Sequence, residues 1–210
     1  SADPRAVIRE LVELDHLTSI VVVGYSLGGN VALRLAGDYG FETPSALRSV
    51  CVVSPTMDLA LCVDALEKPR NALYQWNFVR NLKRRMRRKA RVLPDQFDMS
   101  RLRHVRSVRE FDEAFTAPHH GFRDSGDYYY RASSLRVVDR IAIPTLILSA
   151  DDDPFVPVEQ FTNDALRSNP AVTVIVTHGG GHCGFFTKPN ADFDGYWAEQ
   201  TAVMFSEQHL

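Results

Sequence analysis

The sequence is most constrained where a short run of branched apolar residues meets a Gly-x-Ser-x-Gly turn. The run spans 20–23, and residues from Asn30 to about Asp38 are compatible with a helix. A strand buried on both faces of a parallel sheet has this composition. Strand, sharp turn and helix in this order are the context of a nucleophile elbow, which lifts a serine hydroxyl clear of the sheet. We therefore predict that Ser26 is a nucleophile.

Glycine at both flanking positions fits the same turn. In a nucleophile elbow, the residues two before and two after the serine crowd against its strained backbone, where a side chain would clash. Gly24 and Gly28 occupy these two positions. We expect both to be glycine for this reason. The alternative is a Gly-Ser turn without chemistry, and the flanking strand and helix argue against it.

Further apolar runs recur along the chain and alternate with helix-compatible stretches. Strands are predicted at 48–54, 143–150 and 172–177, and helices at 3–14, 158–168 and 192–205. Asp3 is the expected N-cap of the first helix, because Pro4 follows it in the first turn. Alternating strands and helices predict an α/β fold, a mostly parallel sheet with helices on both faces. A chain of 210 residues suits a single domain, 1–210.

The region between the second and third runs differs in character. From about 58 to 134 no buried-strand pattern occurs, which predicts a helical cap inserted between strands. His119 and His120 have no carboxylate partner at a ligand-like spacing, so we expect both to be structural. The aromatic residues of this region either line an acyl pocket or pack the cap onto the sheet. They are Phe111, Phe115, Phe122, Tyr128, Tyr129 and Tyr130.

One predicted helix of this region is strongly cationic. Apolar residues recur at helical spacing from Phe78 to Ala90, and arginines and lysines lie between them over 80–91. The pattern predicts either attachment to an anionic membrane surface or an ordinary solvated helix. The first interpretation supplies a rival function, a non-catalytic module that binds a membrane or a partner through 80–91.

Only one predicted helix precedes the strand that leads to Ser26. A buried parallel strand needs a neighbour on each side to pair its backbone groups. We therefore expect that the N-terminal strands of the domain are missing from this sequence. A compact variant of the fold, or pairing with a second chain, is the alternative.

Two more polar groups follow predicted strands as the serine does. Asp153 comes after the run at 143–150, and His182 lies in a glycine-rich loop after the last run. Parallel strands end at one edge of a sheet, so the three groups should meet there. A histidine can take the proton of a serine, and a carboxylate can orient the histidine. The order Ser, Asp, His therefore predicts a catalytic triad.

The pattern leaves alternatives for two of these roles. Asp152 is the second choice for the acid and Asp151 the third, while His178 is the rival for the base. An oxyanion hole needs two backbone N–H donors, and Leu27, the residue after the serine, should supply one. The other normally comes from a loop after an early strand, and this chain offers no candidate for it.

Composition limits the function classes. A net charge of −2 gives no overall attraction to nucleic acid, which we do not expect as a partner. Cys51, Cys62 and Cys183 are too few for a disulfide framework and lack zinc-ligand spacing, so we expect buried thiols in a reducing compartment. No run reaches transmembrane length, and no signal peptide opens the chain. The expected location is cytoplasmic, with peripheral membrane association as a variant.

Four segments resemble the YheT-like α/β-hydrolases, a group of bacterial predicted esterases and eukaryotic hydrolase-domain lipases. They are 24–30, 152–155, 180–185 and most of 111–129. The resemblance implies an α/β-hydrolase fold and hydrolysis of carboxylic esters, in a small-molecule or lipid substrate, through an acyl-enzyme. It implies Ser26, Asp153 and His182 as the catalytic residues and no metal or organic cofactor. The same triad would also serve an acyltransferase or a thioesterase.

Overall fold

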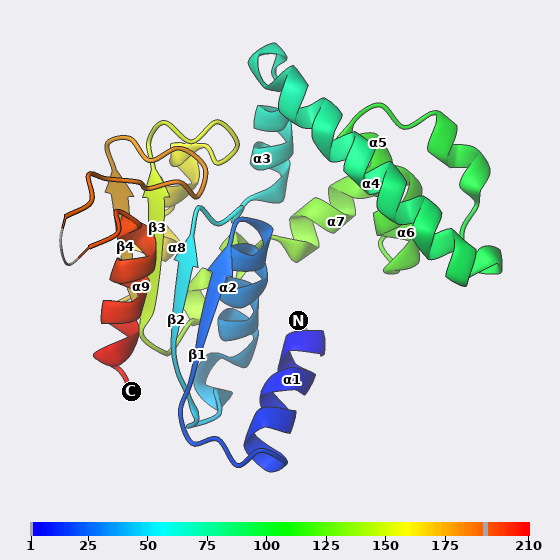
Figure 1. The fold of residues 1–210 in the computed structure, drawn as a ribbon. Helices are drawn as coiled ribbons and strands as arrows, with labels where there is room; N and C mark the ends of the chain where they lie inside the picture. The colour runs from blue at the N-terminus through cyan, green and yellow to red at the C-terminus, as the bar shows by residue number, and fades with distance from the viewer. Residues whose placement is uncertain (1, 191–192) are drawn as a thin grey trace. The chain divides into compact units, whose positions relative to one another are not determined.

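The computed structural model describes residues 2–190 and 193–210, which form two compact units (Figure 1). The first unit comprises Ser1–Asp58 and Ser133–Leu210, and the second is Leu59–Ala132. The predicted cap at 58–134 concerns the same stretch as the second unit, and its role as a cap stays a prediction. The helices are α1 Ala2–Glu13, α2 Leu27–Tyr39, α3 Leu59–Leu66, α4 Ala72–Val92, α5 Val108–Phe111, α6 Ala117–His119, α7 Ser125–Ala132, α8 Asp164–Arg167 and α9 Trp197–Glu207.

Within the described residues, the first unit is built on a parallel sheet in the order β1-β2-β3-β4. The strands are β1 Ile20–Tyr25, β2 Leu47–Val53, β3 Thr145–Ala150 and β4 Val172–Thr177. The pairing places Val23 opposite Cys51 and Cys51 opposite Leu146. Because all the strands run in one direction, they end at the same edge of the sheet. The parallel α/β sheet predicted from the sequence is confirmed.

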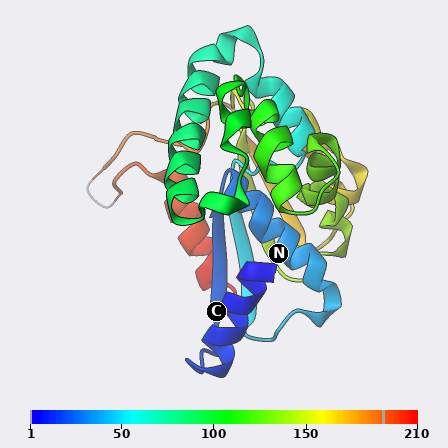
Figure 2. The ribbon, with the colours of Figure 1, turned by 90° about the vertical axis from the view of Figure 1, so that its right-hand side faces the viewer.

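Helices cover both faces of this sheet. On one face α1 and α2 pack against β1, where Ile8, Ile20 and Leu35 are buried together. On the other face α9 packs against β2 and β3, with Ala198 beside Cys51. Figure 2 shows α2 and α9 on opposite sides of the strands. Residues alternate between the faces along a strand, so the apolar runs of β2 and β3 are buried on both sides.

The strand before Ser26 departs from its prediction. β1 lies at an edge of the sheet and pairs with β2 alone among the described strands. Val23 is 47% exposed and Tyr25 37% exposed. Burial on both faces is therefore wrong for Val23, which belongs to the predicted run, and Tyr25, which lies just beyond that run, is exposed as well. The reason is their register: they lie opposite β2 residues that face α9, and α9 covers β2 and β3 but not β1.

The predicted helix at 158–168 is also wrong, because it is two short pieces. A 3-10 turn spans Val158–Thr162, and α8 follows after Asn163. Asn163 has extended backbone angles, and its side chain accepts a hydrogen bond from the N–H of Ala165. An asparagine in this geometry is an N-cap, so it ends one element and starts the next.

The strand predicted at 172–177 matches β4 at both ends, and other predicted elements differ from the structure at their ends. β3 begins at Thr145, after Pro144, which has no N–H to donate to a neighbouring strand. Asp3 lies in the first turn of α1 and not at its N-cap, because the helix already includes Ala2. The predicted start of the last helix at 192 lies outside the described residues, and α9 begins at Trp197.

The second unit has a core of its own. Val79 and Met86 of α4 pack with Phe111 and Phe115. Tyr129 is buried in a neighbouring cluster of the same unit. Three of the predicted aromatic residues, Phe111, Phe115 and Tyr129, therefore stabilise the second unit itself. Of the helices within 2–190 and 193–210, none combines the length and the apolar character needed to cross a bilayer.

Polar contacts tie the second unit together as well. The Tyr129 hydroxyl donates a hydrogen bond to Oδ2 of Asp112 at 2.8 Å. Burial raises the pKa of Asp112, although the hydrogen bonds from Thr116 and Tyr129 oppose this. His119 lies against the Phe97 ring, with centroids 5.0 Å apart. This packing contact is consistent with the structural role expected for His119.

Candidate active site

Ser26 occupies a sharp turn between β1 and α2. Its φ of 51° and ψ of −120° lie outside the regions that residues with a side chain prefer. The Ser26 N–H donates to the carbonyl of Val53 at 2.9 Å, and its own carbonyl accepts from the N–H of Gly29 at 3.0 Å. The helix begins at Leu27 and not at Asn30, so the serine stands directly between strand and helix.

The two flanking glycines have different roles. A Cβ on Gly24 would lie 2.5 Å from the carbonyl oxygen of Gly28, closer than real Cβ contacts allow. A Cβ on Gly28 would meet nothing within 4 Å. The expectation that Gly28 is glycine for lack of space is therefore wrong. Gly28 instead supplies the backbone that crowds Gly24, and at Gly29 a Cβ would lie 2.9 Å from the Cβ of Pro55.

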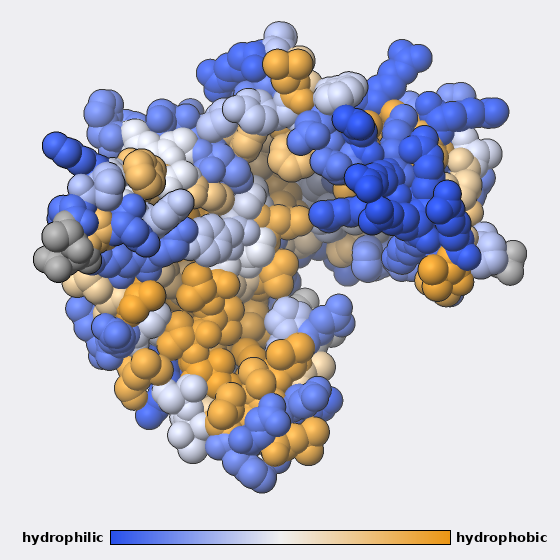
Figure 3. Space-filling view, in the orientation of Figure 1, coloured by the Kyte–Doolittle hydropathy of each residue, from blue (hydrophilic) through white to orange (hydrophobic). Residues whose placement is uncertain are grey.

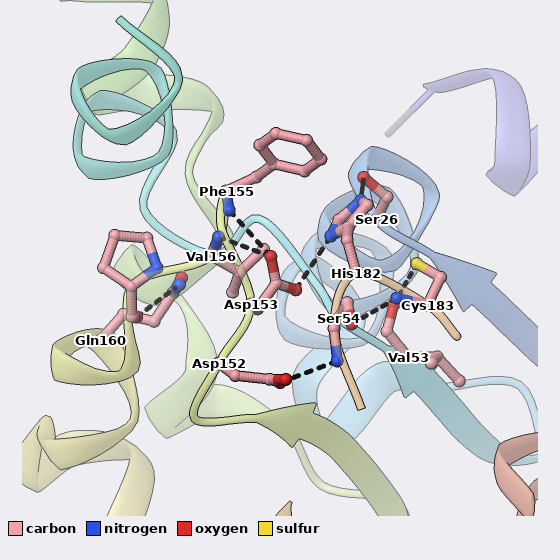
Figure 4. A network of polar contacts seen from close by, with 12 residues as sticks. Ser26, Val53, Ser54, Asp152, Asp153, Phe155, Val156, Gln160, His182 and Cys183 are labelled. Atoms are coloured by element: carbon pink, nitrogen blue, oxygen red, sulfur yellow. Dashed lines mark hydrogen bonds and ion pairs between the residues drawn. The ribbon is translucent and has the colours of Figure 1, made fainter. Parts of the chain in front are cut away.

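The structure brings the three predicted catalytic residues together (Figure 4). Nε2 of His182 lies 2.9 Å from Oγ of Ser26, and Nδ1 lies 2.9 Å from Oδ2 of Asp153. The Asp153 side chain is fully buried, while that of His182 is 18% exposed. Oδ1 of Asp153 accepts hydrogen bonds from the N–H groups of Phe155 and Val156. These bonds fix the carboxylate, which in turn can fix the imidazole.

Opposing effects set the pKa of His182. Burial lowers this pKa, but hydrogen bonding and electrostatic interactions with Asp153 and Cys183 raise it to about 9. The neutral tautomer that fits the geometry donates from Nδ1 to Asp153 and leaves Nε2 to accept from Ser26. This arrangement can take a proton from the serine hydroxyl and hold the resulting imidazolium beside a carboxylate.

Asp152 lies beside this site without reaching the histidine ring. Its Oδ1 accepts a hydrogen bond from the N–H of Gly181 at 2.7 Å. Gly181 has φ +60° and precedes His182 in the loop. Asp152 therefore holds the backbone next to the histidine, while Asp153 holds its ring.

The third choice for the acid and the rival base pair with each other. Oδ2 of Asp151 lies 2.7 Å from Nδ1 of His178, and its Oδ1 accepts from the N–H of Gly179. The side chain of His178 is fully exposed. The hydrogen bond that His178 donates to Asp151, and the charge of that carboxylate, raise the pKa of His178. This pair links Asp151, which follows β3, to the first residues after β4, and neither of these contacts of Asp151 involves Ser26.

Ser54, which the sequence analysis did not assign, also holds the histidine loop. It directly follows β2, is fully buried, and has φ +47°. Its Oγ accepts a hydrogen bond from the N–H of Cys183 at 3.1 Å. Its place just after a strand, at the same edge as Ser26, was the available signal. Cys183 is half-buried and so differs from the buried thiol that was predicted.

The predicted oxyanion donor, the N–H of Leu27, lies at the start of a helix. Leu27 is the first residue of α2, and the first N–H groups of a helix have no carbonyl partner within that helix. The positive end of the helix dipole lies at the same point and favours a developing negative charge. The second donor stays unassigned. Within the part of the chain that the structure describes, no three His, Cys, Asp or Glu residues are grouped as a metal site.

The sequence comparisons find a hydrolase family and relatives that are named as hydrolases. The sequence profile described as "Alpha/beta hydrolase family" matches residues 1–194. "Phospholipase ABHD3" of Mus musculus is 31% identical over 96% of this chain and 47% of its own length. "Putative esterase YheT" of Escherichia coli (strain K12) is 37% identical over 78% of this chain and 48% of its own length, which confirms the resemblance found from the motifs.

The solved structures show the same fold. An esterase of Pyrococcus furiosus, Pf2001, superposes with a TM-score of 0.54 at 16% identity, over 99% of this chain and 60% of its own. At this identity the likeness concerns the fold alone. The chain spans about half the length of the curated relatives it matches.

Proposed function

Because the chain belongs to the alpha/beta hydrolase family, we propose that it is a serine hydrolase that cleaves carboxylic esters through an acyl-enzyme. One observation carries the proposal. His182 lies 2.9 Å from Ser26 on one side and 2.9 Å from Asp153 on the other. A serine hydroxyl is a weak nucleophile at neutral pH, and a histidine within hydrogen-bond reach activates it.

Each residue then has a defined role in the first half-reaction. Oγ of Ser26 attacks the ester carbonyl carbon while its proton passes to Nε2 of His182. The N–H of Leu27 donates to the oxygen that becomes negative in the tetrahedral intermediate. When the intermediate collapses, the bond to the alcohol oxygen breaks and His182 returns the proton to that oxygen. The products are a free alcohol and a Ser26 ester.

Water completes the cycle with the same residues. His182 takes a proton from water as the water oxygen attacks the acyl carbon, and returns it to Oγ of Ser26 as the acyl bond breaks. The carboxylic acid leaves and the free serine is restored. Asp153 holds the imidazole in one tautomer and one orientation throughout.

The names of the relatives support a carboxylic ester as the substrate class. The mouse relative is named a phospholipase and the Escherichia coli relative an esterase. We propose that this protein acts on carboxylic esters of intermediate polarity, in a small molecule or a lipid. An acyltransferase or a thioesterase would form the same acyl-enzyme and differ only in the bond cleaved or in the acceptor.

A panel of chromogenic esters, phospholipids and acyl thioesters tests this proposal. We expect hydrolysis of esters with a rapid first release of alcohol, because acylation of Ser26 precedes its slower hydrolysis. Ser26→Ala should abolish both the burst and the turnover. Faster cleavage of thioesters than of esters would indicate a thioesterase. Transfer of the acyl group to an added alcohol in place of water would indicate an acyltransferase. Activity that survives Ser26→Ala would end the proposal.

A further inference from the structure

Helix α4 carries a dense cationic surface that the proposed chemistry does not use. The helix has 21 residues, which makes it about 30 Å long. It contains eight basic residues and no acidic one. Val79 and Met86 are its fully buried residues. The basic residues are Arg80, Lys83, Arg84, Arg85, Arg87, Arg88, Lys89 and Arg91.

The described part of the chain offers these charges no carboxylate partner. Among the side chains that the structure describes, none of the eight forms an ion pair with a carboxylate. Like charges three or four residues apart on a helix repel one another and cost stability. Arg80 and Arg84 have this spacing, and so do Arg87 and Arg91. A polyanion bound along the helix would turn this repulsion into attraction.

The same exposed side of α4 also carries large apolar residues. Leu73 is 82% exposed and Trp76 is 59% exposed. Leu73 and Trp76 lie on the same side of the helix as Arg80 and Arg84, because successive members of this set are three or four residues apart. The Arg80 guanidinium lies 5.4 Å from the centroid of the Trp76 ring. In Figure 3 hydrophilic atoms cover most of α4. Leu73 and Trp76 lie in its first two turns, ahead of the cations.

We propose that this face of α4 binds the surface of a bilayer that contains anionic phospholipids. The arginines contact lipid phosphates, and Leu73 and Trp76 enter the interface between head groups and acyl chains. A nucleic acid would use the same cations and stack on Trp76, but it gives an exposed leucine no apolar surroundings. The leucine therefore favours the bilayer. This inference is independent of the proposed ester chemistry.

Binding of the full chain to sedimented vesicles tests the charge contribution. We expect binding to phosphatidylcholine vesicles that contain phosphatidylserine, weak binding to phosphatidylcholine alone, and a steep loss with added salt. Each cation near an anionic surface contributes about fivefold in affinity. The variant R80Q/R84Q/R87Q/R91Q should therefore bind about a hundredfold more weakly or worse. Circular dichroism confirms that this variant remains folded.

A matched variant separates a local surface from net charge. R9Q/R48Q/R140Q/R167Q removes four exposed arginines of the first unit, with the same change in net charge. It should keep the affinity of the unaltered chain. If it loses as much affinity as the α4 variant, binding follows net charge and the proposal is overturned.

Tryptophan emission tests the apolar contribution. The chain has two tryptophans, so Trp197→Phe leaves Trp76 as the only indole fluorophore. Emission from Trp76 should shift to shorter wavelength when anionic vesicles are added, because the ring leaves water. No binding to anionic vesicles at low salt, or unshifted emission in bound protein, contradicts the proposal. Tighter binding to a single-stranded RNA than to vesicles would assign the helix to nucleic acid and also overturn it.

Discussion

Nε2 of His182 lies 2.9 Å from Oγ of Ser26 although 156 positions separate the two residues in the sequence. The contact forms because β1 and β4 belong to one parallel sheet and both residues follow the C-terminal end of their strand. Loops that follow parallel strands meet at one edge of the sheet, so distant segments supply one site. This contact is what allows His182 to take the proton of Ser26.

The three consecutive aspartates should differ sharply in their effect on activity. Asp153→Asn should lower kcat by about 10⁴, because an amide can hold the imidazole in the wrong tautomer. Asp151→Asn is the matched control and should keep most of the activity, because the Asp151 carboxylate accepts from His178 and from the N–H of Gly179 and lies outside the contacts of His182. Steady-state hydrolysis of a chromogenic ester measures both. A larger loss in Asp151→Asn than in Asp153→Asn would reassign the acid.

The pH dependence of kcat/KM should follow His182. Only neutral imidazole accepts the serine proton, so activity rises as pH rises through the pKa of this group. Burial lowers that pKa, but Asp153 and Cys183 raise it to about 9, so the midpoint should lie above 6.5. Cys183→Ala removes one partner and should move the midpoint to lower pH. A midpoint at or below 6.5 in the unaltered chain would contradict the assignment.

Protonation of His182 should affect stability in the opposite direction, so that its contribution to the free energy of unfolding falls as pH rises. Its folded-state pKa is raised above 6.5, so protonation of His182 stabilises the native state. That contribution is fully present below pH 6.5 and is lost as pH rises through about 9. Urea unfolding at several pH values, compared with His182→Gln, measures it. The difference between the two proteins should shrink between pH 6.5 and 9.

The flanking glycines give a matched pair of stability tests. Gly24→Ala should destabilise the fold by about 1–3 kcal/mol or more, because the new Cβ meets the Gly28 backbone. Gly28→Ala should be neutral or stabilising by up to about 1 kcal/mol, since its Cβ has open space and alanine favours a helix. Denaturant unfolding measures both. Equal destabilisation by the two substitutions would contradict the described turn.

Substitution of Ser54 should lower stability and the acylation rate more than substitution of Ser149, another buried serine. Ser54→Ala removes the acceptor for the Cys183 N–H, which should cost about 0.5–1.5 kcal/mol and slow acylation of Ser26 by loosening the histidine loop. Oγ of Ser149 is buried and has no partner among the described atoms, so Ser149→Ala should cost nothing. Unfolding and acylation rates of both variants decide whether the loop depends on Ser54.

Much of the site could be predicted because its residues follow strands with clear apolar runs. The run at 20–23 and the turn after it locate Ser26, and proline after Asp153 separates that residue from its neighbours. The sequence predicted a strand buried on both faces, and Val23 is about half exposed because sheet position depends on pairing between distant segments. Local composition does not carry that information.

The supporting contacts could not be predicted for a related reason. Asp152 and Ser54 bind backbone N–H groups of the histidine loop, and a backbone N–H leaves no signature in the sequence. Asn163 looked like part of a helix at 158–168, although its capping bond divides that stretch. The motif indicated that neither Gly24 nor Gly28 has room for a side chain, and this holds for Gly24 alone. The partners of Asp152 and Ser54 are set by tertiary structure, whereas the contacts of Asn163 and Gly24 are local and depend on the backbone angles of their turns.

Mapping the adduct of a fluorophosphonate probe tests the central claim most directly. The probe reacts with an activated serine, and mass spectrometry of the digested protein identifies the residue. The account predicts one adduct, on Ser26, absent in Ser26→Ala and formed far more slowly in His182→Gln. An adduct on another residue, or labelling of Ser26 at an unchanged rate without His182, would contradict it.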